Sequence, residues 1–122
     1  MVETALSLLV VTTIVFGTME FARLTYAYNF VGYAAQEAVR YASVRGSASG
    51  DPATQDSVTR FVRAQAIGLI ASDLVVKTSW PAGNEPGNTV NVQVTYNLPG
   101  VVGSLLPATS TVSGTAQMVI TQ

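Results

Sequence analysis

The chain has 122 residues, of which 48% are hydrophobic and only 11% charged, with a net charge of −1 and a mean hydropathy of +0.37. An average soluble domain carries about 25% charged residues. Because nucleic-acid binding needs a basic surface, this balance argues against a nucleic-acid partner. The sequence has no cysteine and no histidine. This composition excludes thiol chemistry, the commoner zinc sites and most general-base mechanisms. We therefore expect no enzyme activity, no metal and no cofactor.

The N-terminal part opens with an uncharged run, residues 4–19 (TALSLLVVTTIVFGTM). This run continues into an amphipathic stretch, and no proline occurs before Pro52, so we expect one unbroken helix over about residues 2–46 with Gly17 as its weakest point. Such a helix would be roughly 66 Å long, whereas a globule of this chain length is about 30 Å across. The apolar part of the helix therefore needs lipid, or other copies of the chain, to cover it.

Small residues recur at every fourth position in the second half of this helix. They are Ala34, Ala38, Ala42 and Gly46. A stripe of small residues lets another backbone approach closely. The approaching element is either a neighbouring subunit or the chain's own head, and the sequence leaves both alternatives open.

A second, shorter helix is expected at about residues 53–73. Asp51 and Pro52 form a start signal, with Asp as the N-cap and Pro at the first helical position. Apolar residues from Val58 to Ile70 then fall on one face of the helix. This helix would cover part of a sheet.

The last third of the chain changes to a period of two, which indicates strands. We expect strands at residues 74–80, 89–98 and 110–121, with a loop at PGVVGSLLP (99–107). Short connections favour an antiparallel sheet with one apolar face, which the two helices can cover. The fold class is therefore α+β, with residues 1–46 as a hydrophobic and amphipathic N-terminal helix and residues 47–122 as a small α/β head.

Three stretches of the chain resemble the TadE-like family of the type IV pilin (Tad pilus) superfamily. They are the start MVETALSLLVV, the segment EFARLTYAYNFVGYAAQEAVRYA, and the tail with VTYNLPG, LLP and GTAQMVIT. The resemblance implies a pilin-like fold, a leader removed by a prepilin peptidase, and a stage in the inner membrane. It also implies a homo-oligomeric helical filament on the cell surface, built by pilus assembly machinery. The family's glutamate usually lies two positions deeper than Glu3, so we expect two further residues before Met1 or a different processing site.

Glu3 is the sharpest candidate for a functional residue. An uncompensated carboxylate in an apolar environment is costly, and the resemblance implies that Glu3 pairs with the terminal amine of a neighbouring subunit. The alternative is a hydrated carboxylate at the lipid headgroups. The expected assembly residues are Glu3, Leu8, Val11, Val15, Phe16, Gly17, Ala34, Ala38 and Ala42.

The favoured function is a structural subunit of a type IV-like (Tad) pilus filament. The alternative is a single-pass inner-membrane minor pseudopilin that primes pilus assembly or binds an assembly partner. A surface adhesin is a third possibility, although the Ser/Thr-rich head specifies no ligand.

Overall fold

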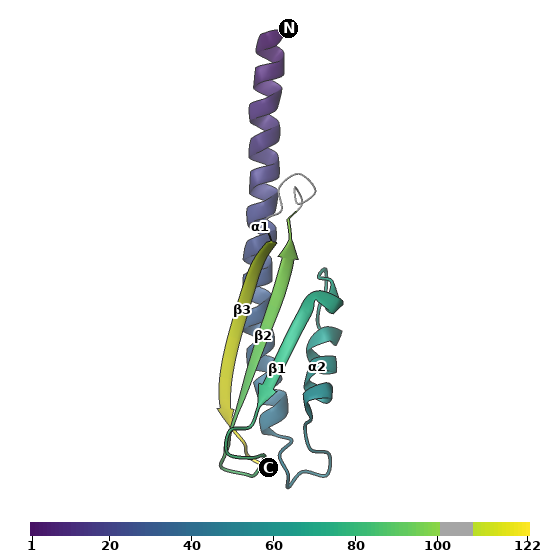
Figure 1. Cartoon of the computed structure of the whole chain (residues 1–122), viewed down its shortest axis with the longest axis vertical. Coiled ribbons are helices and arrows are strands. Elements are labelled where there is room, and N and C mark those ends of the chain that lie inside the picture. Colours follow the sequence, from purple (N-terminus) through teal and green to yellow (C-terminus); the bar gives the residue numbers. More distant parts are fainter. Residues whose placement is uncertain (101–108) are drawn as a thin grey trace.

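The computed structural model describes residues 1–100 and 109–122, and Figure 1 shows a long helix with a small head around its lower half. The elements are α1 (Val2–Ser43), α2 (Gln55–Ala64), the one-turn 3-10 helix η1 (Ala71–Asp73), β1 (Leu74–Ser79), β2 (Thr89–Pro99) and β3 (Thr109–Val119). This confirms the predicted α+β fold. The loop predicted at 99–107 lies almost entirely outside the described residues.

The helix α1 is one continuous element of 42 residues, as the absence of proline predicted. It ends at Ser43, three residues before the predicted end, because the next residues form a tighter turn. The N–H of Arg45 donates to the carbonyl of Ala42, three residues back, at 3.2 Å. Gly46, the expected stop, instead lies buried against the C-terminal residues: a Cβ there would clash with the backbone of Gln122.

The helix α2 is shorter than predicted, and its start signal was misread. Thr54 is the N-cap: its Oγ1 accepts the N–H of Ser57 at 3.2 Å, and its own N–H donates to the Ser57 hydroxyl at 2.9 Å. This reciprocal cap satisfies two free donors, whereas Asp51 pairs with Arg45 at 2.8 Å. The helix ends at Ala64, and the chain then turns at Gly68, whose φ of 76° suits glycine.

The sheet is an antiparallel meander in the order β1-β2-β3, and every strand end lies within two residues of the predicted one. Alternation places one side of β2 in the core, namely Val90, Val92, Val94, Tyr96 and Leu98. α1 packs on β2 and β3, and α2 packs on β1. The opposite face carries mainly Thr, Ser, Asn and Gln and stays open to solvent.

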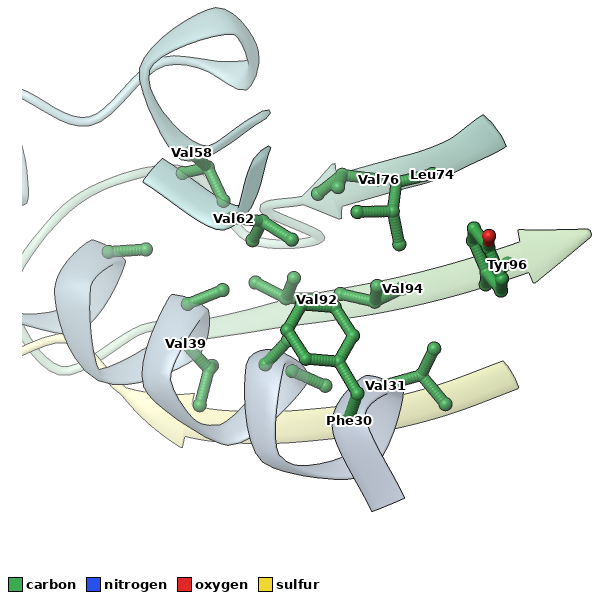
Figure 2. Close-up of a cluster of buried hydrophobic side chains, with 14 of the residues drawn as sticks. Phe30, Val31, Val39, Val58, Val62, Leu74, Val76, Val92, Val94 and Tyr96 are labelled. Carbon is green, nitrogen blue, oxygen red and sulfur yellow. The ribbon is translucent and has the colours of Figure 1, made fainter. Parts of the chain in front are cut away.

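The core of the head includes the lower half of α1. Figure 2 shows side chains from both helices and from the sheet meeting in one cluster. The labelled members are Phe30, Val31, Val39, Val58, Val62, Leu74, Val76, Val92, Val94 and Tyr96. At the end of the head far from the N-terminus, Tyr41 of α1 stacks on Phe61 of α2 with ring centroids 4.5 Å apart. One face of α1 is therefore part of the core of the head, while Tyr28, Tyr33 and Arg40 on its other face stay exposed.

Candidate assembly surface

The first half of α1 projects from the head without any intramolecular cover (Figure 1). Residues 1–19 are all exposed. The large apolar side chains among them and just beyond are Met1, Val2, Leu6, Leu8, Leu9, Val10, Val11, Ile14, Val15, Phe16, Met19 and Phe21. Within the described part of the chain, α1 is the one helix long and apolar enough to cross a membrane, by length and composition.

This surface is unfavourable in water. Hiding one large apolar side chain stabilises by about 1.5–3 kcal/mol relative to full exposure, and the side chains of this segment are about half exposed or more. Together they carry a hydration cost of the same order as the whole stability of a small domain, about 5–15 kcal/mol. The apolar side chains lie all around the helix, and such a helix is covered by lipid or by a bundle of helices.

Hydroxyl side chains along the exposed segment bond to the helix backbone. Ser7 donates to the carbonyl of Glu3 at 2.9 Å, and Thr13 donates to that of Leu9 at 2.8 Å. Thr18 and Thr25 donate in the same way, each at 2.9 Å. These hydroxyls therefore need no external partner in an apolar surrounding.

Six of the predicted assembly residues gather on this exposed segment. Leu8, Val11, Val15 and Phe16 are 66%, 57%, 56% and 48% exposed. Glu3 lies in the first turn of α1, where its negative charge complements the helix dipole. A Cβ on Gly17 would meet no atom within 4 Å, so nothing inside the chain requires glycine there. The structure thus places all six where another molecule can reach them.

The three predicted alanines lie elsewhere. Ala34, Ala38 and Ala42 are at most 1% exposed and belong to the core of the head. Of the two alternatives left open by the sequence, the structure shows the stripe in contact with the chain's own head. Gly114 of β3 also approaches α1 closely, since a Cβ there would lie 2.5 Å from the backbone oxygen of Val31.

Polar contacts lie at the height along α1 where the helix emerges from the head. Arg23 pairs with Glu20 at 3.4 Å and donates to the carbonyl of Pro99 at 3.4 Å. One turn further, the Tyr26 hydroxyl donates to the carbonyl of Ile67 at 2.7 Å. Glu20 and Arg23 are three residues apart, a spacing that allows an ion pair on a helix, whereas no sequence pattern signals the two contacts with residues far along the chain.

In the residues that the structure describes, no three His, Cys, Asp or Glu side chains lie close enough to hold a metal ion. The grooves on the head are open. One of about 490 Å³ lies between α1 and β3 and is lined by Tyr28, Tyr33, Gln36 and Thr115, among others.

Comparison with known protein families gives a match for the N-terminal part of the chain. Residues 1–40 match the model of the family described as TadE-like protein. The N-terminal third of the chain is therefore similar to TadE-like proteins. The match confirms the resemblance for the first stretch and nearly all of the second, and it does not reach the tail. It covers the whole exposed segment and most of the part of α1 that lies in the core. No curated protein and no solved structure matches the chain.

Proposed function

We propose that this protein is a structural subunit of a type IV-like (Tad) pilus filament. In this proposal the exposed half of α1 packs with the same segment of other copies to form a dry filament core, and the heads form the outer layer on the cell surface. The observation that carries the proposal is the continuous, uncovered apolar segment at residues 1–19, on a helix that is similar to a pilus-associated family.

The same segment suits a stage in the inner membrane before assembly. Residues 4–21 span about 27 Å at 1.5 Å per residue, close to the roughly 30 Å of a hydrocarbon core. Because lipid is as apolar as a helix bundle, moving the segment from lipid to the filament gains much less than moving it from water. Assembly machinery is therefore part of the proposal, as is processing by a prepilin peptidase.

Glu3 and Gly17 are proposed to act at the contact between subunits. A carboxylate inside a helix bundle needs a partner charge, and the terminal amine of a neighbouring subunit supplies one. Gly17 allows a neighbouring helix to approach its backbone closely. The buried alanines contribute indirectly, since they hold the head on α1.

The experiment compares surface filaments and membranes from cells that express the chain. Filaments are sheared from the cells and their subunits are identified by mass spectrometry, for the native chain, for Glu3→Gln, and for the control Glu85→Gln in an exposed turn of the head. We expect the native chain and the control to dominate the filament fraction, and Glu3→Gln to reduce it.

Two results would contradict this proposal. Filaments that consist mainly of another protein, with this chain in the membrane fraction, would favour the minor pseudopilin that primes assembly. Equal filament yields from Glu3→Gln and the control would remove the pairing role of Glu3.

A further inference from the structure

The loop that follows α2, residues 65–70 (QAIGLI), exposes two isoleucines. Ile67 is 78% exposed and Ile70 is 53% exposed. Their neighbours Ala66 and Leu69 pack against the core instead. Two apolar residues of the loop therefore pack against the core, and the other two face outward.

Hydrogen bonds fix this loop near the exposed half of α1. The Tyr26 hydroxyl donates to the Ile67 carbonyl at 2.7 Å, and the Ile70 N–H donates to the Tyr96 hydroxyl at 3.4 Å. Figure 1 shows that the chain leaves α2 on the side of the head that faces the N-terminus. Tyr26 follows Phe21, the last large apolar residue of the exposed segment, by five residues, or about 7.5 Å along the axis.

We propose that the loop at residues 65–70 is a second contact of the head with the lipid bilayer before assembly. This inference rests on the membrane stage of the proposed function. The stretch of residues 4–21, apolar apart from Glu20 near its end, is about 27 Å long and slightly shorter than a hydrocarbon core of about 30 Å. A helix that centres this stretch in the bilayer draws the head against the headgroups.

The depth of the loop fits the headgroup layer. This layer is about 5–7 Å thick on each side of the hydrocarbon, so Tyr26 and Ile67 lie at its outer boundary when α1 stands upright. Membrane helices are commonly tilted by about 20°, and a tilt of this size toward the α2 side brings that side of the head deeper. Tyrosine is enriched at this level of membranes, and Tyr26 joins the apolar surface of α1 to the isoleucines of the loop.

The test uses single cysteines, which the native sequence lacks. Full-length Ile67→Cys, Val11→Cys and Val44→Cys are each labelled with a small fluorophore and reconstituted in phosphatidylcholine vesicles. The vesicles carry a nitroxide either on the headgroup or midway along the acyl chain. Val44 is the matched control, since it is exposed like the loop but lies at the far end of α1, about 27 Å beyond Tyr26.

We expect headgroup nitroxide to quench the label at residue 67 at least about twofold more than the label at residue 44, because the headgroup layer is only about 5–7 Å thick. Acyl-chain nitroxide should quench the label at residue 11 best. Emission of Trp80, the single tryptophan, reports that each variant is folded.

Three results would overturn the inference, and they differ in what they say about the proposed function. Equal headgroup quenching at residues 67 and 44, with residue 11 quenched by the acyl-chain nitroxide, removes the loop contact and leaves the membrane stage intact. No quenching at residue 11 removes the membrane stage as well. Crosslinking of Ile67→Cys between copies, without headgroup quenching, assigns the isoleucines to a contact between subunits.

Discussion

The contact between β3 and α1 depends on the missing side chain of Gly114. A Cβ at this position would lie 2.5 Å from the oxygen and 2.7 Å from the carbon of the Val31 carbonyl, and 2.8 Å from the nitrogen of Gly32. All three atoms belong to the backbone of a continuous helix, so no side-chain rotation can relieve the clash. Gly114→Ala must therefore lift β3 away from α1 by close to 1 Å.

Overpacking of this kind costs about 1–3 kcal/mol. In a domain of this size each kcal/mol lowers the melting temperature by about 4–8 °C, so we expect a loss of roughly 5–20 °C. The melting temperature is measured by thermal unfolding in detergent, followed by circular dichroism and by Trp80 fluorescence. The sheet should lose its fixed position while α1 keeps its helical signal.

Gly32→Ala is the matched control, because the backbone nitrogen of Gly32 belongs to the same contact while its own Cβ would point into open space. A Cβ on Gly32 would meet no atom within 4 Å, and alanine in a helix is favoured over glycine by about 0.5–1 kcal/mol. We therefore expect the control to leave the melting temperature unchanged or to raise it. An unchanged melting temperature for Gly114→Ala, or equal losses for both variants, would refute the close approach of β3 to α1.

Three further variants test other parts of the chain. Ala34→Leu, at a site 1% exposed, should cost about 1–3 kcal/mol in thermal unfolding; a neutral effect would contradict tight packing of α1 under the sheet. Gln55→Ala removes the side chain that donates to the Val76 carbonyl at 2.6 Å and accepts the Thr78 N–H at 2.7 Å. It should cost about 1–2 kcal/mol in denaturant unfolding, and no change would show that solvent replaces both bonds. Gly17→Leu should leave unfolding of the head unchanged but reduce sheared filaments, and normal filament yield would exclude close helix packing at that residue.

The sequence predicted the elements whose pattern is local. The absence of proline before Pro52 was enough to predict an unbroken α1, and the strict alternation from Val90 to Leu98 was enough to predict β2 and its buried face. In both cases the same residues determine the element and its burial, because the spacing of the apolar residues matches the side of the element that is buried.

The end of α2 was not predictable in this way. Ala66 and Leu69 continue the helical spacing of Val58 and Val62, so the pattern alone extends the helix past Ala64. In the structure these two residues reach the core from a loop that turns at Gly68. Loop residues that pack against the core can have the same sequence spacing as one face of a helix. Here the positive φ of Gly68 distinguishes the loop from a helix.

The role of the alanine stripe could not be decided from the sequence either. Small residues permit close approach by any backbone, whether from the same chain or from another. In the structure the stripe is buried by residues far along the chain, and β3 approaches the same helix closely at Gly114, 80 residues after Ala34. Long-range pairs of this kind leave no periodic signal.

The continuity of α1 constrains how the proposed filament forms. The exposed apolar segment and the residues buried under the head belong to one helix of 42 residues. Because the head is fixed to this helix at Arg23, at Tyr26 and through the buried alanines, the head moves wherever the apolar segment moves. When the segment leaves the bilayer, every contact of the head with lipid must break in the same step. A lipid contact at Ile67 would therefore add to the work of extraction, and replacing Ile67 by a polar residue would ease release of the subunit without touching the filament core.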